Sequence, residues 1–349
     1  MDAALIIISY LCVLFVVLPI VKSDFWIFRV LEYSRFQNFV LCSVIICLQL
    51  VYWQFSGSLA IIPLLLNMLC WAYLLVKIIP YTVFWKKEVI NVKQRNSGKG
   101  LKLINANVLQ DNKSYSRLLK QIENYKPDLI LLLETDKLWQ EAMAVLKQDY
   151  PYTIEVPQDN TYGMLFYSKY RLEDARVNFL VKGDIPSIKC EVVLPDGEKI
   201  QLWGLHPEPP VPGESLTSTA KDKELSIVAL QVKDSTLPVI VMGDLNDVAW
   251  SYTTSLFTKT SGLLDVRRGR GFYSTFSAHH WFVRFPLDYI FCSADFGFIA
   301  MKRLPENGSD HFPIFTHLLL QPSIKQMQEK EKANNEDLEE AERKARKTI

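Results

Sequence analysis

The sequence predicts a layered α/β domain preceded by an N-terminal region of transmembrane helices. Two observations carry this prediction. Three long apolar runs occupy the first 85 residues, whereas residues 100–320 alternate between short β-branched runs and segments with helical spacing. The cysteines fit this division, because four of the six lie before residue 86 and the rest show no metal-binding spacing.

The apolar region, residues 1–85, is expected to contain about three transmembrane helices. The candidates, in chain order, are residues 4–21, 39–53 and 59–76, with a polar turn at 54–58 between the last two. A signal peptide is the alternative for the first run, but Asp2 and the absence of a preceding Lys or Arg disfavour it. Lys and Arg follow the first and third runs, so the positive-inside rule favours a cytoplasmic soluble domain on a multi-pass protein.

Residues 86–99 are polar and are expected to form a linker. Beyond it, the pattern predicts a strand over 101–108, a helix over 115–125 and a buried strand over 129–133. Asp136 is expected to cap the next helix. The remaining predictions are strands at 153–156, 164–167, 188–194, 200–205, 239–242, 287–291 and 312–318, and a helix at 218–233. This alternation indicates one α/β domain over residues 100–320.

The final segment, residues 321–349, is rich in Ala, Glu and Lys and contains no aromatic residue. Its acidic residues precede its basic residues, which is typical of a solvated helix or a disordered segment. We therefore expect a charged tail without a packing partner, and a partner-binding helix is the alternative.

Polar side chains of only four residue types follow the ends of the expected strands. The most distinctive stretch ends in Gly-Asp-Leu-Asn, where Asp244 and Asn246 leave a buried strand on one face. A simple turn is the alternative for this stretch alone, because Asp, Asn and Gly are common turn residues. The other residues at such strand ends are Asn107, Glu134, His206, Asp288, Asp310 and His311.

These residue types match the needs of phosphate-ester hydrolysis. Carboxylates hold a hard divalent cation, a base activates water, and hydrogen-bond donors stabilise the charge that develops on phosphoryl oxygens. Oxygen ligands without a Cys/His cluster favour Mg²⁺ or Mn²⁺. The sequence contains neither a Gly-x-Ser-x-Gly motif nor a P-loop. Its net charge of +1 gives no global basic field for nucleic acid.

On these motifs the soluble part resembles the endonuclease/exonuclease/phosphatase superfamily, which has the deoxyribonuclease I-like fold. The motifs are Asn107, Glu134, His206, Gly243-Asp-Leu-Asn246, Leu287-Asp-Tyr289 and Ser309-Asp-His311. Finer features, His206-Pro207, Trp250-Ser251 and Gly269-Arg-Gly271, resemble the bacterial membrane-anchored branch. The resemblance implies two mixed β-sheets packed as a sandwich with flanking helices, a site at one edge, and a place in the bacterial plasma membrane.

The resemblance also implies the metal ligands. Glu134 is expected to be the principal ligand of Mg²⁺ or Mn²⁺, with Asn107 close to the metal and Asp310 within its reach. Many nucleases of the family carry an acidic residue two places after the first Asn, and Leu109 stands there instead. The number of metal ions is therefore left open at one or two.

The remaining roles concern the reacting groups. Asp244 is expected to activate or orient the attacking water, and Asn246 to hold the scissile phosphate. His206 and His311 are expected to donate hydrogen bonds to phosphoryl oxygens, with Asp288 orienting His311 and stabilising its charge.

Arg284 is a further expected substrate-binding residue, because it directly precedes the strand of Asp288 and a guanidinium group suits phosphate. The predicted function is a membrane-anchored, metal-dependent phosphoesterase that acts on a phosphodiester or a phosphomonoester. The expected partners are the lipid bilayer and a phosphate ester, for which the anchor makes a lipid-linked phosphate reasonable. A nuclease acting on DNA or RNA is the first alternative and a non-enzymatic membrane scaffold the second. The oligomeric state is left open.

Overall fold

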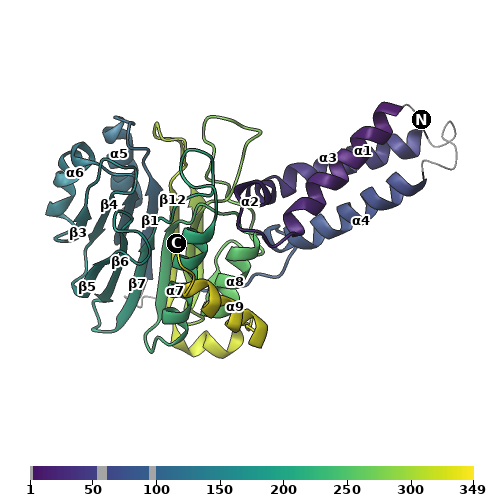
Figure 1. The fold of residues 1–349 in the computed structure, drawn as a ribbon. Coiled ribbons are helices and arrows are strands. Elements are labelled where there is room, and N and C mark those ends of the chain that lie inside the picture. Colours follow the sequence, from purple (N-terminus) through teal and green to yellow (C-terminus); the bar gives the residue numbers. More distant parts are fainter. Residues whose placement is uncertain (1–2, 53–60, 94–99) are drawn as a thin grey trace.

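The computed structural model describes residues 3–52, 61–93 and 100–349. A bundle of apolar helices projects from a domain that contains two β-sheets (Figure 1). The expected turn at 54–58 and the second half of the expected linker, residues 94–99, lie outside the described residues.

Twelve strands build the two sheets within the described residues. The first sheet consists of β1 (Gly100–Asn107), β2 (Leu129–Leu133), β3 (Tyr152–Val156), β4 (Met164–Ser168), β11 (Phe296–Arg303) and β12 (Ile314–Leu320). The second consists of β5 (Leu172–Asn178), β6 (Ser187–Val193), β7 (Lys199–Leu205), β8 (Val239–Asp244), β9 (Leu264–Asp265) and β10 (Asp288–Cys292). The prediction missed three strands: β5, whose residues are mostly polar, β9, which is only two residues long, and β11, whose alternation is interrupted by a bulge between Phe298 and Ala300.

The sheets run in the orders β11-β12-β1-β2-β4-β3 and β5-β6-β7-β8-β10-β9. β1 pairs with β2 in parallel, β7 pairs with β8 in parallel, and the other pairs are antiparallel. The expected pair of mixed sheets is therefore confirmed. A continuous apolar core fills the space between them, and it includes Leu131, Met242 and Ile290.

Helices cover the outer face of each sheet. α5 (Tyr115–Tyr125), α6 (Lys137–Met143) and the 3₁₀ helix Ala144–Gln148 pack on the first sheet, and α7 (Thr219–Lys233) and α8 (Tyr252–Ser261) pack on the second. Asp136 caps α6 as expected, accepting from the Trp139 N–H at 2.8 Å. Covered on both faces, β2 buries all five of its residues, which explains its unbroken apolar run.

One glycine is required where β8 ends. Gly243 has φ 149° and pairs with Leu205 of the parallel strand β7. A Cβ at this position would lie 1.9 Å from the Leu205 carbonyl oxygen, so any larger residue would push the two strands apart. Gly243 thus fixes the height at which Asp244 leaves the sheet.

The N-terminal helices are α1 (Ala3–Val17), α2 (Trp26–Tyr33), α3 (Arg35–Val51) and α4 (Ile61–Ile78). α1, α3 and α4 pack around a small core that contains Cys12, Cys42 and Cys70. By length and apolarity, one described helical segment, Ile61–Tyr81, is able to span a bilayer. The pair α2 and α3 qualifies as a second only if its 67° bend is counted as one span. The expectation of about three spans is therefore met only in part.

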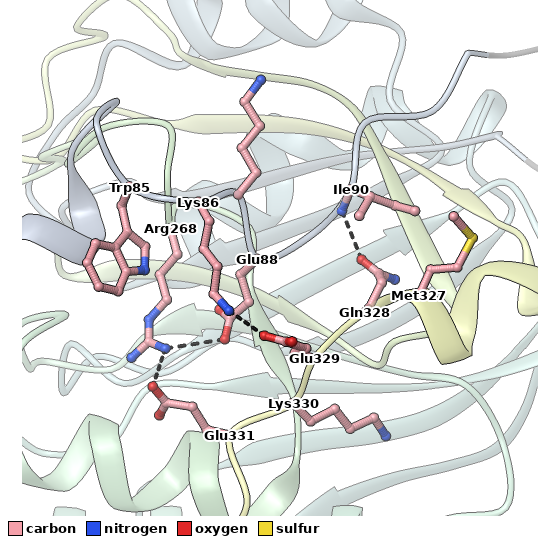
Figure 2. A pocket seen from close by; sticks show the side chains of 11 residues that line it. Trp85, Lys86, Glu88, Ile90, Arg268, Met327, Gln328, Glu329, Lys330 and Glu331 are labelled. Carbon is pink, nitrogen blue, oxygen red and sulfur yellow. Dashed lines mark hydrogen bonds and ion pairs between the residues drawn. The ribbon is translucent and has the colours of Figure 1, made fainter.

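Residues 86–93 do not form a free linker. Val89 is fully buried, Asn91 forms a parallel bridge with Phe298, and the Ile90 N–H donates to Gln328 at 2.9 Å. Figure 2 shows this segment beside residues 327–331, around a cavity of about 400 Å³. The linker prediction was wrong here because the two apolar residues Val89 and Ile90 anchor an otherwise polar stretch.

The C-terminal segment also packs against the domain. It contains the 3₁₀ helix Pro322–Met327 and α9 (Asn335–Ala345), which begins with a capping box between Asn334 and Asp337. Ala341 is fully buried, and the Lys344 ammonium group contacts Asp222 of α7 at 2.6 Å. The expected tail without a packing partner was therefore wrong, although its helical form was anticipated. Ala341 and the ion pairs of Lys344 with Asp222 and of Asp337 with Lys259 hold this charged helix against the domain.

Candidate active site

The expected polar residues lie at one edge of the sandwich because of the strand topology. The carboxyl ends of the parallel strands β1 and β2 bring Asn107 and Glu134 to the same edge. Asp244 ends β8 in the second sheet, and its antiparallel neighbour β10 begins at Asp288, directly opposite Asp244. The start of one strand and the end of its neighbour thus supply two carboxylates side by side.

The first group of residues links the two sheets. The Asn107 side-chain amide donates to Glu134 at 2.6 Å and to Asp244 at 3.2 Å. The Leu109 N–H donates to the Asn107 side-chain oxygen at 3.1 Å, which fixes the orientation of the amide. Burial raises the pKa of Glu134 to about 7, against the hydrogen bond from Asn107, which lowers it.

The second group is centred on His311. Its Nδ1 lies 2.8 Å from an Asp288 carboxylate oxygen, and its Nε2 lies 3.5 Å from Asp244. The other Asp288 oxygen accepts from the Asn105 side chain at 3.0 Å. All four side chains are buried, so the imidazole is held between two carboxylates out of water.

This arrangement favours a charged imidazole. Burial alone lowers the pKa of His311, but Asp244 and Asp288 outweigh burial and raise that pKa to about 10. Burial also raises the pKa of Asp244, which the charge of His311 opposes. With a carboxylate at each ring nitrogen, we assign His311 as the cation and both aspartates as anions.

His206 differs from His311 in its surroundings. It is buried beneath the ring of Tyr162, with ring centroids 5.3 Å apart, and its Nδ1 has no hydrogen-bond partner among the described residues. Burial lowers the pKa of His206 to about 4, so this imidazole is neutral near pH 7. It offers one N–H to a substrate oxygen rather than a positive charge.

Asn246 is held by the backbone around it. It adopts φ 48°, and its N–H donates to Asp244 at 2.9 Å. Its side-chain amide donates to the Pro207 carbonyl at 3.0 Å, which places it beside His206. One amide hydrogen remains for a ligand, as the expected phosphate contact requires.

The donor set at this edge fits a hard divalent cation. Glu134 offers a partly buried carboxylate with one oxygen outside the Asn107 hydrogen bond, and Asp310 is close enough that its charge raises the pKa of Glu134. Asp244, Asp288 and His311 also bring ligand atoms within 4.8 Å of one another. Because His311 Nδ1 is already bonded to Asp288, we interpret that trio as a hydrogen-bonded network, which leaves the free oxygen of Glu134 as the position that could hold a cation.

Residues 92–311 match the profile of the Endonuclease/Exonuclease/phosphatase family. The chain belongs to this family. The predicted resemblance is thereby confirmed, and with it the prediction of a hydrolase that acts on phosphate esters. No curated protein was found to match the sequence.

Solved structures of the Endonuclease/Exonuclease/phosphatase fold resemble the domain at low identity. A humanized D. rerio TDP2 aligns with TM-score 0.52 and 17% identity, over 64% of this chain and 99% of that one. A Bacteroides vulgatus family member (TM-score 0.51, 16% identity) covers 64% and 99%, and the human Nocturnin catalytic domain (TM-score 0.51, 16% identity) covers 64% and 95%. At these identities the likeness establishes the fold alone.

Two of the predicted site residues, Asp310 and Arg284, make fewer contacts with the other site residues. Asp310 lies between Ser309 and His311, and its side chain is 3.5 Å from the Ser309 hydroxyl. Arg284 lies over the ring of Phe312, 4.7 Å from the centroid, with its Nη1 buried and lacking a partner among the described residues. Arg284 is therefore next to the site but not hydrogen-bonded to the other predicted residues.

The prediction missed two residues that support the site. The Asn105 side chain donates to Asp288. The Ser309 hydroxyl donates to the Asn107 carbonyl at 2.8 Å and accepts from the His311 backbone N–H at 3.0 Å. The period of two in β1 places Asn105 on the same face as Asn107, which is the signal that could have identified it.

The helices at the N-terminus contact the loop that follows Asp244. The Tyr33 hydroxyl donates to the Asn246 carbonyl, and Arg35 donates to the Trp250 carbonyl at 2.5 Å. The Trp250 indole donates to the Glu32 carbonyl at 2.8 Å, and the Tyr81 hydroxyl donates to Ala249 at 2.5 Å. The 245–251 loop is therefore held by residues from outside the catalytic domain.

Proposed function

We propose that this chain is a membrane-anchored phosphoesterase that depends on Mg²⁺ or Mn²⁺. The observation that carries the proposal is the pair of connected groups at one sheet edge. Asn107 joins Glu134 to Asp244, and His311 joins Asp244 to Asp288. A cation position, a water-orienting carboxylate and a charged donor thus lie in one hydrogen-bonded network.

Each side chain has a role that its surroundings support. Glu134 holds the cation, with Asn107 and Asp310 beside it, and the bound cation supplies charge stabilisation to a phosphoryl oxygen. Asp244 orients the attacking water. Charged His311 donates to the phosphoryl group as negative charge develops.

The substrate is held by neutral and peripheral groups. Asn246 offers its free amide hydrogen to the scissile phosphate, and neutral His206 donates to a second phosphoryl oxygen. Arg284 lies over the ring of Phe312, the neighbour of His311, and its Nη1, which has no partner among the described residues, suits a further anionic group of the substrate.

The membrane anchor is supported by the outer faces of the N-terminal helices. Large apolar side chains are exposed along all three long helices, among them Leu14, Val44 and Leu69. Polar contacts are turned inward, as in the hydrogen bond from Gln49 to Ser9 at 3.0 Å. This inside-out pattern suits lipid surroundings rather than water.

The proposed location is the bacterial plasma membrane, with the catalytic domain on the cytoplasmic side. Basic residues at the domain end of the bundle, including Lys22, Lys77 and Lys86, follow the positive-inside rule. Protease added to intact cells should leave the catalytic domain uncut, whereas release of a domain-sized fragment would reverse the orientation.

The substrate class is a phosphodiester or phosphomonoester, and an anchored domain favours a lipid-linked phosphate. A nuclease is the second candidate, because a D. rerio TDP2 structure of the same fold is described as complexed with single-strand DNA product. A net charge of +1 disfavours a long duplex, whose binding requires several contacts from Lys or Arg to phosphates. A non-enzymatic scaffold is disfavoured because the catalytic residue types are all present.

An activity panel on the full chain in detergent tests the proposal. The full chain is required because Tyr33, Arg35 and Tyr81 hold the 245–251 loop, so a fragment that begins at residue 96 would lack these contacts. The panel contains a generic phosphodiester, a phosphomonoester, single- and double-stranded DNA, and lipid phosphates. We expect hydrolysis with Mg²⁺ or Mn²⁺ and loss of activity in excess chelator.

The variant Glu134→Gln separates metal binding from other effects of chelation. Gln keeps the shape and one acceptor oxygen but loses the charge, so half-maximal activity should need about tenfold more Mg²⁺ or higher. Undiminished hydrolysis in excess chelator, or an unchanged Mg²⁺ requirement in this variant, would show that Glu134 does not hold a catalytic cation.

A further inference from the structure

A second cavity, of about 310 Å³, lies where the N-terminal helices meet α8 of the catalytic domain. None of the residues at the strand-end site lines it. Five basic side chains line it against two carboxylates, Glu32 and Asp337. The basic residues are Lys22, Arg29, Arg35, Lys77 and Lys259. We refer to this cavity as the base pocket.

The charges of the base pocket are only partly balanced. Arg35 is paired with Glu32 at 2.6 Å, and Lys259 is paired with Asp337 at 3.4 Å. Lys22 and Lys77 form no ion pair with a carboxylate in the part of the chain that the structure describes. Their ammonium groups contact tyrosine rings instead, 4.9 Å from the Tyr252 centroid for Lys22 and 5.8 Å from the Tyr73 centroid for Lys77. The pocket therefore has surplus positive charge.

Arg29 adds a buried hydrogen-bond donor without an acceptor, although its charge is balanced by ion pairs. Arg29 is 5% exposed, and its Nη2 contacts Asp24 and Asp222 at 3.4 and 3.3 Å. Its Nε has no hydrogen-bond partner among the described residues. A buried guanidinium N–H without an acceptor is costly, so an anion that accepted from it would be bound favourably.

The cavity of Figure 2 provides the contrast. It also has basic side chains, but Lys86 is paired with Glu329, and Arg268 is paired with Glu88 at 3.2 Å and Glu331 at 2.6 Å. Two more lysines line it without a carboxylate partner in the described part of the chain, Lys87 and Lys330. Its basic side chains therefore exceed its carboxylates by one, against three in the base pocket. Among its described lining residues, no buried side-chain donor lacks a hydrogen-bond partner, whereas the Arg29 Nε of the base pocket does.

The rim of the base pocket indicates which anion it takes. Ile20 and Val21 line the pocket and are both 51% exposed, and the neighbour of Lys77, Val76, is 68% exposed. The cationic interior is therefore continuous with the apolar outer surface of the helices. A free phosphate would contact only the cationic interior. A phospholipid would contact both the cationic interior, through its head group, and the apolar surface, through its acyl chains.

We propose that the base pocket binds the phosphate head group of an anionic phospholipid, with its acyl chains along the exposed faces beside Ile20 and Val76. This proposal rests on the membrane anchor proposed above. Lys22 and Lys77 supply the positive charge, the Arg29 Nε–H donates to a phosphate oxygen, and Tyr73 and Tyr252 frame the head group.

The test measures lipid binding to the full chain in detergent, with dioctanoyl phosphatidylglycerol, dioctanoyl phosphatidylcholine and inorganic phosphate as separate probes. Phosphatidylglycerol should bind about tenfold tighter than phosphatidylcholine or phosphate. The double variant Lys22→Gln/Lys77→Gln should lose most of this difference. The matched control is Lys120→Gln/Lys137→Gln, which removes two exposed lysines from α5 and α6 and should bind like the wild type.

Equal binding by the double variant and the control would overturn the proposal. Inorganic phosphate that binds as tightly as phosphatidylglycerol would show a free-anion site instead of a lipid site. Metal-dependent hydrolysis of a soluble ester, measured on the same samples, reports the catalytic proposal separately. We expect neither double variant to change it, since none of the four lysines lies in the catalytic site.

Discussion

Replacing Asp244 with Asn should reduce kcat by about 10³-fold, in the range expected for loss of a positioned general base. The substitution is nearly isosteric, and the amide oxygen is still able to accept from the Asn246 N–H that now lies 2.9 Å from the carboxylate. What disappears is the negative charge that orients water and faces His311, together with the second oxygen, which accepts from the Asn107 amide at 3.2 Å. KM should change little, because Asp244 acts on water and not on the bound ester.

Steady-state kinetics of the full chain at saturating Mg²⁺ measures this effect. The matched control is Asp174→Asn on the exposed strand β5, where the same chemical change removes only a surface pair with Arg176 and should leave activity intact. The melting temperature of the control should stay close to that of the wild type, and that of Asp244→Asn must be measured beside its rate, so that a loss of fold is not counted as a loss of catalysis. If Asp244→Asn retained activity within tenfold of the wild type, Asp244 would not orient the nucleophile.

Local pattern was sufficient to predict most of the catalytic domain. The run 129–133 is apolar throughout because β2 is buried on both faces, and Asp136 caps α6 because its side chain satisfies a free N–H. The strand-end positions of Asn107, Glu134 and Asp244 were likewise readable, since the side chains that follow parallel strands share one edge. These features depend only on residues that are neighbours in sequence, or on the rule that parallel strands end at the same edge of a sheet.

Contacts between distant segments could not be predicted in this way. The hydrogen bond from Tyr33 to the Asn246 carbonyl joins residues 213 positions apart, and no local pattern marks either partner. The burial of Lys344 against Asp222 was missed for the same reason, because a charged helix resembles a solvated one until its partner is known. The protonation of the two histidines also depends on tertiary contacts, since identical side chains have pKa values of about 4 and about 10.

The pair Asp288 and His311 should behave as one catalytic unit. The 2.8 Å contact between Asp288 and His311 Nδ1 orients the ring and stabilises the imidazolium that faces the phosphoryl group. Asp288→Asn should therefore reduce kcat by about 10²-fold, the scale of losing one transition-state donor, with a smaller change in KM. His311→Ala should cost at least as much, because it removes the donor itself.

The double variant decides whether the two residues are coupled. If Asp288 acts through His311, then once the imidazole is gone the carboxylate has nothing left to orient, and the double variant should be little slower than the slower single variant. Because Asp288 also accepts from Asn105 at 3.0 Å, the melting temperatures of all four proteins must be compared with their rates, so that a loss of fold is not counted as coupling. Two losses that simply multiply, in proteins of equal stability, would show that the residues act independently and that the dyad does not exist.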